Sequence, residues 1–349
     1  MRIALDGREV EAPHGIGRVL CHLLDAPAPA ETERLLLVNR PPRRQWPGVT
    51  PCFLSRWHWL RLGAWLTAQR VDAFYSPYYK LPRGFGGRMT CTVHDLGFLV
   101  YPQQHYTRGR FYRRIARWRL NHALAAAAAV VAVSPFSRQE LLAHTAINPA
   151  AIAVIPSGYD AGIYLPGPAD PAVAARLGIS GGYLLYVGNC TPHKRVELLI
   201  EAWRPDAGQL QLVIISAPDR HQQALRARYP DAGIIWASTV ADNDLATLYR
   251  NAACFVFPSD YEGFGIPPVE ALACGCPVVA TRRAALPDTL GDAAYWADPT
   301  PAGLRAGWHE VLGNPALRTR LLAAAAPLLA CYRHDVTGRQ LWKVITGGN

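Results

Sequence analysis

The sequence has a low content of charged residues and no long apolar run. Charged residues make up 18% of the 349 positions and apolar residues 50%, a composition that excludes a chain disordered throughout. The longest apolar runs, 123–133 and 321–331, are shorter than the roughly 20 residues that cross a bilayer. The opening residues MRIALDG lack the charged stretch and apolar core of a signal peptide. We therefore expect neither a membrane-spanning helix nor secretion.

Metal-binding motifs are also missing. The eight cysteines are scattered without CxxC spacing, and Cys274 and Cys276 have no second pair or nearby histidine to complete a zinc site. No acidic pair of the DxD type follows a predicted strand. We expect no metal and no cofactor, and we interpret the cysteines as buried or free thiols in a reducing cytosol.

The formal charge of +10 is concentrated in one half of the chain. Residues 1–175 contain 20 Lys and Arg against 11 Asp and Glu, and the rest is close to neutral. Six arginines between 108 and 119 are interleaved with aromatic residues, and residues 56–65 contain two arginines and three tryptophans. A solvated helix face and a patch for an anionic membrane surface both explain this pattern. Nucleic acid is disfavoured, because no nucleic-acid motif accompanies the charge.

Short apolar runs alternate with helical stretches along the chain. Strands are predicted at 2–5, 35–38, 73–75, 89–93, 130–133, 152–155, 183–187, 212–215, 234–236, 254–256 and 278–280. Helices are predicted at 17–24, 108–128, 196–203, 245–251 and 268–273, and Ser137–Glu140 has the spacing of a capping box that opens another. Uninterrupted apolar strands alternating with helices indicate an α/β fold with parallel sheets covered on both faces.

A segment rich in Gly and Pro, near 159–172, separates the basic half from the neutral half. We predict two doubly wound, Rossmann-like domains facing a cleft, with boundaries 1–162 and 163–330. A C-terminal helix over 331–349 would pack back on the first domain. Ligands of such sheets bind at the carboxyl ends of the strands, so the loops after strands are the places to search for chemistry.

The loop after the strand at 254–256 is the best candidate. It reads SDYEGFGIPPVEALACG from Ser259, with two prolines suited to the first turn of a helix. The amides of Phe264, Gly265 and Ile266 would lie near the unsatisfied N-terminus of that helix, which attracts phosphate or sugar hydroxyls.

Glu262 in this loop and Glu270 in the following helix could each accept hydrogen bonds from the paired hydroxyls of a sugar or a ribose. Taken alone, two glutamates fit a turn cap and a solvated helix face better. However, SDYEGFGIPPVEALACGCPVVAT resembles the E-x₇-E signature of glycosyltransferase family 4, whose members are retaining enzymes of the GT-B fold.

Four further segments resemble this family in the expected order, so that the resemblance spans about residues 3–300. They are the glycine loop Gly15–Arg18, the histidine-bearing strand end Thr92–Leu96, the interdomain segment Val154–Asp160 and the strand–loop–helix Tyr186–Trp203. The implied fold is GT-B, with an acceptor-binding domain over 1–162 and a nucleotide-sugar-binding domain over 163–330.

The resemblance also implies roles for individual residues. Glu262 and His94 would contact the donor sugar, and Lys194 would neutralise the diphosphate leaving group. Asn189 stands where many relatives carry a second basic residue, which leaves open whether His193 or Arg195 compensates. The remaining donor-binding candidates are Gly15, Gly17, Gly188, Val240 in the base-contacting segment 238–240, Phe264, Gly265, Ile266 and Glu270, the ribose partner. Asp95 and Arg18 are candidates for the acceptor side, Asp95 alternatively as a brace of its loop.

The function that follows is retaining transfer of a hexose from a sugar nucleotide. Front-face attack is the favoured mechanism, and a covalent intermediate on Glu262 is not excluded. Resemblance to bacterial mannosyltransferases makes GDP-mannose the first donor, with UDP-glucose, another UDP-hexose or dTDP-rhamnose as alternatives. The acceptor would be a polyprenyl-diphosphate-linked glycan of O-antigen or exopolysaccharide assembly, at the cytoplasmic face of the inner membrane. A non-catalytic sugar-nucleotide-binding protein and a GT-B-like epimerase or phosphorylase are the competing hypotheses.

Overall fold

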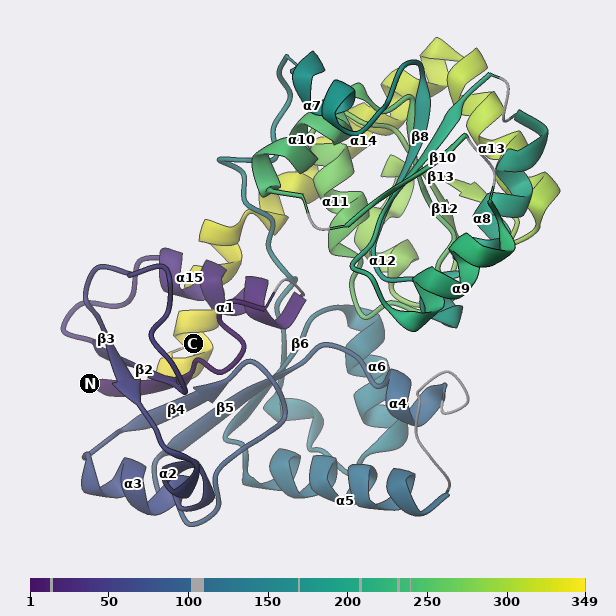
Figure 1. Ribbon diagram of the computed structural model, residues 1–349. Coiled ribbons are helices and arrows are strands. Elements are labelled where there is room, and N and C mark those ends of the chain that lie inside the picture. Colours follow the sequence, from purple (N-terminus) through teal and green to yellow (C-terminus); the bar gives the residue numbers. More distant parts are fainter. Residues whose placement is uncertain are drawn as a thin grey trace. The chain divides into compact units, whose positions relative to one another are not determined.

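The computed structural model describes residues 1–12, 15–101, 110–168, 170–206, 209–230, 233–238 and 240–348. Internal contacts divide the chain into two compact units. Unit 1 comprises Met1–Gly158 and Tyr332–Asn349, and unit 2 comprises Tyr159–Cys331. Each unit is a parallel β-sheet with helices packed against it (Figure 1).

Unit 1 contains a seven-stranded parallel sheet in the order β3-β2-β1-β4-β5-β6-β7. Its strands are β1 (Arg2–Asp6), β2 (Glu33–Val38), β3 (Val49–Phe53), β4 (Ala73–Ser76), β5 (Arg88–Val93), β6 (Ala129–Ala132) and β7 (Ile152–Val154). Its helices are α1 (Gly15–Asp25), α2 (Arg56–Leu60), α3 (Leu62–Ala68), α4 (Gly97–Val100), α5 (Arg110–Ala126), α6 (Pro135–His144), η1 (Pro149–Ala151) and α15 (His334–Thr346).

Unit 2 contains a six-stranded parallel sheet in the order β10-β9-β8-β11-β12-β13. Its strands are β8 (Tyr183–Val187), β9 (Gln211–Ile215), β10 (Ile234–Ala237), β11 (Cys254–Phe257), β12 (Val278–Thr281) and β13 (Ala294–Ala297). Its helices are α7 (Pro171–Arg176), η2 (Pro192–Lys194), α8 (Val196–Trp203), η3 (Arg204–Asp206), α9 (Arg220–Arg228), α10 (Asp242–Asn251), α11 (Ile266–Ala273), α12 (Leu286–Leu290), η4 (Gly291–Ala293), α13 (Pro301–Gly313) and α14 (Pro315–Tyr332), which ends at the border with unit 1.

Both sheets are doubly wound, which confirms the predicted fold class. The central strands are buried along almost their whole length, as expected when helices cover both faces of a parallel sheet. In unit 1 one face of the sheet packs against α1 and α15. The opposite face packs against α3, through Leu62 and Leu66.

The C-terminal helix α15 is part of the core of unit 1. Its residues Leu341, Trp342 and Ile345 are buried against α1 and the sheet. The indole Nε1 of Trp342 donates to the carbonyl oxygen of Leu23 at 3.0 Å. The last helix therefore packs against the first.

Two strands were missed by the sequence analysis, and both are edge strands. β3 contains Pro51 and has partly or fully exposed residues, while β13 contains the half-buried Tyr295 and Trp296. An edge strand is bonded on one side only, so it tolerates proline and needs no uninterrupted apolar run. The apolar pattern is therefore weak in β3, whereas the four residues of β13 are all apolar.

Several helix starts also differ from the prediction; α10 begins at Asp242 and α11 at Ile266, three and two residues before the predicted starts. The N-cap of α6 is Ser134, whose hydroxyl accepts the N–H of Ser137 at 3.0 Å, so the predicted cap Ser137 lies inside the first turn. A proline directly after Ser134 suits the first helical position. The helix predicted at 17–24 begins two residues earlier, so Gly15 of the predicted glycine loop is the first residue of α1.

No helix of the described residues is both long and apolar enough to cross a bilayer. The predicted helix at 108–128 is seen as α5, and its residues 108–109 lie outside the described part of the chain.

Candidate active site

The strand order of unit 2 reverses between β8 and β11, which are neighbours in the sheet. Such a switch point is where doubly wound sheets bind ligands, beyond the carboxyl ends of the strands. The loop after β8 contains Gly188 to Lys194, and the loop after β11 contains Ser259 to Gly265. The structure thus brings two of the predicted motifs to one sheet edge.

Lys194 and Glu262 form an ion pair across these two loops. The ammonium Nζ of Lys194 donates to Oε1 of Glu262 at 2.6 Å, and the two side chains are only 14% and 12% exposed. The Lys194 ammonium also lies 5.8 Å from the centroid of the Phe257 ring at the end of β11. One cation and one carboxylate are therefore held together at the switch point with little solvent around them.

Backbone contacts fix the two loops to each other. The carbonyl oxygen of His193 accepts the N–H of Asp260 at 2.8 Å and the hydroxyl of Ser259 at 3.3 Å. The carbonyl of Ser259 in turn accepts the hydroxyl of Thr281, at the end of β12, at 2.7 Å. The loop carrying Lys194 and the loop carrying Glu262 form one hydrogen-bonded unit.

The residues of the predicted anion-binding end lie at the start of α11, and anion binding itself stays a prediction. Gly265 is the N-cap, with a φ of 97° that favours glycine, and a Cβ there would lie 2.8 Å from Leu286 Cδ2. Pro267 and Pro268 have no N–H, so Ile266 carries the only amide hydrogen of the first three helical positions. The donors at this helix end are therefore confined to Ile266 and the residues before it.

Glu270 lies one turn into α11 and is buried, with 1% of its surface exposed. The hydroxyl of Tyr249 from α10 donates to its Oε2 at 3.3 Å. Glu270 thus accepts a hydrogen bond from a tyrosine on the neighbouring helix. Its role toward a ribose stays a prediction.

Gly188 and Asn189 organise the turn after β8. The N–H of Gly188 donates to the carbonyl oxygen of Ile215 at 3.0 Å, so this amide already has a backbone partner. The side-chain oxygen of Asn189 accepts from the hydroxyl of Thr191 at 2.6 Å. Asn189 therefore braces the turn at the position where a second basic residue was expected.

His193 and Arg195 are the candidates for replacing that missing charge, and both side chains already have partners. Arg195 Nε lies 3.5 Å from Asp260 Oδ2, and His193 Nε2 lies 3.4 Å from the hydroxyl of Thr191. Lys194 is the less exposed of the two cations paired between these segments, with 14% of its side chain exposed against 44% for Arg195. Val240, from the predicted base-contacting segment, is half-buried two residues before α10, and Thr239 lies outside the described residues.

In unit 1 the predicted residues follow β1 and β5. His94 comes directly after β5, and its Nε2 lies 2.9 Å from the carbonyl oxygen of Pro77, which follows β4. Asp95 accepts the N–H of Gly97 through Oδ1 at 2.9 Å, so it braces the start of α4. Its role on the acceptor side stays a prediction.

Gly17 lies in a crowded position of the first turn of α1. A Cβ there would lie 2.3 Å from the carbonyl oxygen of Ala12 and 2.5 Å from that of Glu9. Glycine at this position is explained by close approach of the preceding loop. Gly15 begins the helix, and Arg18 is half-buried one residue beyond Gly17.

The sequence analysis missed an ion pair at the carboxyl end of β1. Arg8 donates to Asp6 twice, from Nε at 2.9 Å and from Nη2 at 2.5 Å. Burial opposes the charge of Arg8, but the bonds to Asp6 outweigh it and raise the pKa of Arg8 above its ordinary value. The available signal was an aspartate directly after a predicted strand, with an arginine two residues later.

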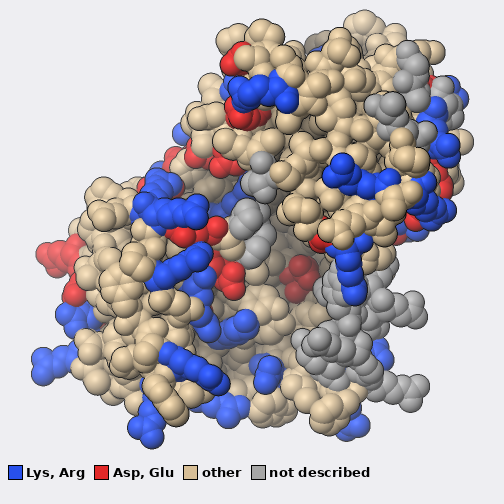
Figure 2. Space-filling view, in the orientation of Figure 1, with Lys and Arg blue, Asp and Glu red and all other residues tan. Residues whose placement is uncertain are grey.

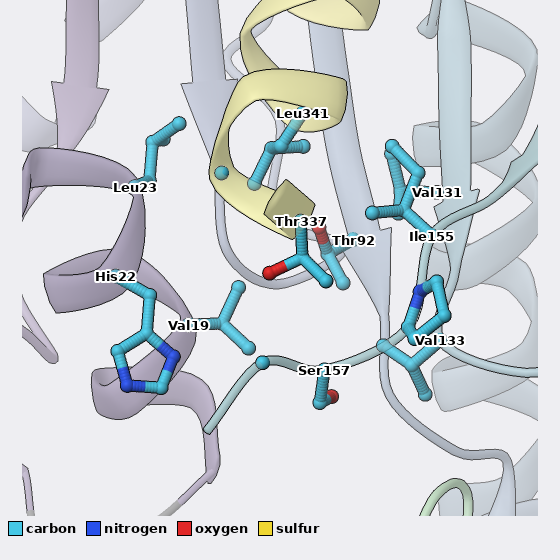
Figure 3. Close-up of a pocket in the computed structure, with 13 residues that line it drawn as sticks. Val19, His22, Leu23, Thr92, Val131, Val133, Ile155, Ser157, Thr337 and Leu341 are labelled. Atoms are coloured by element: carbon cyan, nitrogen blue, oxygen red, sulfur yellow. The ribbon is translucent and has the colours of Figure 1, made fainter. Parts of the chain in front are cut away.

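A small cavity in unit 1 is separate from these groups. It measures about 20 Å³, room for about one water molecule, and Figure 3 shows Val19, His22 and Leu23 of α1 and Thr337 and Leu341 of α15 around it. Burial, together with the nearby His334 and Arg18, lowers the pKa of His22 to about 3, so this imidazole is neutral at ordinary pH. The cavity is too small for a sugar.

Within the described residues, no group of three or more His, Cys, Asp or Glu side chains is placed to hold a metal ion. Most of the cysteines are buried, and burial raises the pKa of the Cys190 thiol to about 11. That no metal takes part in the reaction stays a prediction.

The sequence matches two protein families over nearly its whole length. Residues 179–326 match the family described as "Glycosyl transferases group 1", and residues 18–162 match "Glycosyltransferase Family 4". O-antigen chain mannosyltransferase B of Escherichia coli is 31% identical over 296 residues, which cover 81% of this chain and 70% of that protein. D-inositol 3-phosphate glycosyltransferase of Kineococcus radiotolerans is 32% identical over 231 residues, 58% of this chain and 53% of that one.

Solved structures share the fold over the whole chain. WaaG, a glycosyltransferase involved in lipopolysaccharide biosynthesis, has a TM-score of 0.77 at 18% identity, with all of both chains covered. Anabaena Alr3699/HepE, solved in complex with UDP and glucose, has a TM-score of 0.76 at 17% identity, covering 99% of this chain and 100% of that one.

Proposed function

The chain belongs to glycosyltransferase family 4, and from this premise we propose that it transfers a hexose from a sugar nucleotide to a lipid-linked glycan. The observation that carries the proposal is the Lys194–Glu262 ion pair, 2.6 Å long, at the switch point of unit 2. A sugar diphosphate needs both partners of this pair, a cation for the leaving phosphate and a carboxylate for sugar hydroxyls.

Donor binding is assigned to unit 2. Lys194 neutralises the charge that develops on the departing diphosphate, together with amides at the start of α11. Glu262 accepts hydrogen bonds from hydroxyls of the donor sugar, and Glu270 from the ribose. The contact between Glu270 and Tyr249 supports this assignment, because it helps to fix the orientation of this buried carboxylate.

The reaction that we propose retains the anomeric configuration through front-face attack. The acceptor hydroxyl approaches the face that the phosphate leaves, and a phosphate oxygen helps to take its proton. His94 contacts the donor sugar, and its bond to Pro77 fixes the orientation of its ring. A covalent intermediate on Glu262 would place a water-labile ester there, which denaturing mass spectrometry of the protein with donor alone would detect.

Mannose is the proposed sugar and GDP-mannose the donor. The similarity to an O-antigen chain mannosyltransferase supports this choice, whereas the UDP complex of a structural neighbour favours a UDP-hexose as the second candidate. Thermal-shift measurements with GDP, UDP and dTDP separate the donors. Stabilisation by GDP alone is expected, and stabilisation by UDP without GDP would contradict the mannosyl assignment.

We further propose that unit 1 binds the acceptor at the inner face of the cytoplasmic membrane. Figure 2 shows Lys and Arg side chains over the visible face of unit 1. Large apolar side chains are exposed on the same unit, at Trp57 and Leu60 of α2 and at Phe111 and Trp118 of α5. Aromatic and basic side chains together are the combination that binds anionic lipid surfaces.

Turnover separates this proposal from a non-catalytic sugar-nucleotide-binding protein of the same fold. A binding protein would be stabilised by nucleotide but would leave the donor unchanged. Incubation with each labelled sugar nucleotide and an extract of lipid-linked glycans is expected to move label into the lipid fraction. Label that stays in the donor would contradict the proposed function, and label in an altered free sugar nucleotide would indicate an epimerase.

A further inference from the structure

The switch point of unit 1 holds an ion pair in the place that corresponds to Lys194 and Glu262 in unit 2. In unit 1 the strand order reverses between β1 and β4. Asp6 is the last residue of β1 and Ser76 the last residue of β4. Ligands of doubly wound sheets bind beyond the carboxyl ends at such a point. The Asp6–Arg8 pair therefore lies where a ligand of unit 1 is expected.

The pair is rigidly held. Asp6 is 4% exposed and accepts two bonds from the Arg8 guanidinium, at 2.9 Å and 2.5 Å, and one from the Arg8 backbone N–H at 3.3 Å. The hydroxyl of Ser76 lies 3.4 Å from its Oδ2. Two parallel bonds between a guanidinium and a carboxylate fix the plane of both groups. The Arg8 side chain nevertheless remains 30% exposed, so the buried carboxylate presents an oriented cation at the surface.

A tryptophan completes the arrangement. The Cζ atom of Arg8 lies 4.1 Å from the centroid of the Trp59 ring. The indole Nε1 of Trp59 donates to the side-chain oxygen of Asn39, directly after β2, at 2.5 Å. Trp59 is thereby anchored to the same edge of the sheet from the neighbouring strand. The guanidinium and the indole thus form one ordered surface, which the buried carboxylate holds in place.

This surface lies beside His94 along the sheet edge. His94 contacts the carbonyl oxygen of Pro77, and the N–H of Tyr78 donates to the hydroxyl of Ser76, which in turn contacts Asp6. β1, β4 and β5 are consecutive neighbours, so the ends of β1 and β5 are two strand spacings apart, roughly 10 Å. That separation suits a group bound next to the sugar that His94 contacts.

We propose that Arg8, oriented by the buried Asp6, and Trp59 bind the sugar ring of the acceptor that receives the hexose; this inference rests on the proposed transfer. The Arg8 side chain is 30% exposed and carries N–H groups beyond the two that bond to Asp6, and the hydroxyls of a sugar can accept from such groups. The pair is neutral overall, whereas a phosphate is better bound by an unpaired cation. The recognised group is therefore the glycan rather than its lipid diphosphate.

Unit 1 contains a matched control for this site. Arg44 donates to both carboxylate oxygens of Asp25, the last residue of α1, and its Cζ lies 5.2 Å from the centroid of the Trp46 ring. This trio has the same three residue types, yet it lies at the far end of α1. That helix has 11 residues and is therefore about 16 Å long. Loss of Arg44 removes an equivalent brace away from the switch point.

The test compares Arg8→Gln, Arg8→Lys and Arg44→Gln with the wild type. The acceptor is an extract of lipid-linked glycans from cells in which this gene is deleted, at varied concentration, and the donor is the sugar nucleotide that supports transfer. The rate of donor hydrolysis without acceptor and the melting temperature are measured in parallel. We expect both Arg8 variants to raise the acceptor KM at least about tenfold, with donor KM and donor hydrolysis within about twofold of wild type. Arg44→Gln is expected to leave every kinetic parameter unchanged.

Several results would overturn the site. The first is an unchanged acceptor KM in Arg8→Gln, and the second is an equal rise of the acceptor KM in Arg44→Gln. The third is a loss of donor hydrolysis in Arg8→Gln that parallels the loss of transfer. The fourth is full activity of Arg8→Lys, because a point charge would then be sufficient and the ligand would be a phosphate. A wild-type protein that neither transfers nor hydrolyses any donor contradicts the proposed function itself. That outcome is distinguishable, because it appears before any variant is compared.

Discussion

The charges of Lys194 and Glu262 are compensated mainly by each other. Their side chains are 14% and 12% exposed, and the ammonium-to-carboxylate distance is 2.6 Å. Removing one partner leaves a charge with little water around it, which is more unfavourable than removing both. The pair can therefore be tested through stability, independently of any substrate.

We predict that Lys194→Gln and Glu262→Gln each lower the free energy of unfolding by about 1–3 kcal/mol. The double variant should lose clearly less than the sum of the two, because it leaves no unpaired charge. Urea unfolding of the four proteins measures the coupling. Losses that add within about 0.5 kcal/mol would contradict a direct interaction.

The residue types of the candidate site could be predicted from the sequence, but their contacts could not. Lys194 and Glu262 are 68 positions apart, and their contact requires β8 and β11 to be neighbours. Asp6 and Arg8 were missed for the opposite reason. They are two positions apart, a spacing so common that it acquires meaning only when β1 is known to flank the switch point.

At the scale of secondary-structure elements, Asp206 of η3 connects η3 to α13 through hydrogen bonds. It is fully buried and accepts from Arg305 at 2.7 Å, from Trp308 at 2.9 Å and from His309 at 2.7 Å, all on α13. Burial opposes the charged form of this carboxylate, but these bonds outweigh it and lower the pKa of Asp206 below its ordinary value of 3.8. One carboxylate thus connects two elements through three side chains.

The lowered pKa of Asp206 has a consequence for acid stability. A carboxylate whose pKa is lower in the folded state stabilises the protein above its unfolded pKa, and this contribution is lost as the pH falls through the folded value. We predict that the wild type loses stability more steeply than Asp206→Asn as the pH falls below about 4. Urea unfolding at a series of pH values between 3 and 7 measures both slopes. Parallel curves would contradict the role assigned to Asp206.

The packing of α15 within unit 1 leads to a prediction about stability. Trp342 is buried, and it bonds to Leu23 on α1. Trp342→Ala should lower the free energy of unfolding by about 3–5 kcal/mol, because it leaves a large cavity between the first and last helices. Trp57→Ala is the control, since that side chain is 76% exposed and its loss should leave the melting temperature unchanged. Equal melting temperatures of the two variants would contradict this packing.

The sequence predicted elements well where burial is complete and poorly where it is partial. α8 was predicted with its observed bounds, because six of its eight residues are buried and its apolar pattern is dense. β3 was not predicted, because this edge strand contains a proline and exposed residues, whereas β13 is an edge strand of four residues, two of them only half-buried. The start of α6 was misplaced by three residues, since Ser134 and Ser137 are both plausible caps and only the bond to a backbone N–H distinguishes them.

At the scale of the whole molecule, the charge is distributed unevenly along the chain. The excess lies in residues 1–175, and Arg114, Arg117 and Arg119 are exposed on α5 beside Trp118. Both a solvated arginine-rich helix and a membrane-binding surface explain these observations. They differ in what happens when anionic lipid is present.

We predict that replacing Arg114, Arg117 and Arg119 by Gln weakens binding to vesicles of phosphatidylglycerol and phosphatidylethanolamine at least about tenfold, since each basic residue near an anionic surface contributes about 1 kcal/mol. The same replacement of the exposed Arg226, Arg318 and Arg320 of unit 2 removes equal charge and should have little effect. Co-sedimentation at low and high salt measures both. Equal effects of the two triple variants, or no binding by the wild type, would contradict a membrane surface on α5.

The most direct test of the account is mass spectrometry of lipid-linked glycans incubated with sugar nucleotide and either wild-type protein or Glu262→Gln. The glycans come from cells that lack the gene, so that they include the natural acceptor. The account predicts that the wild type adds one hexose to a lipid-linked glycan, whereas Glu262→Gln adds at most about one hundredth as much while still binding nucleotide. No added hexose with any donor, or equal addition by Glu262→Gln, would contradict it.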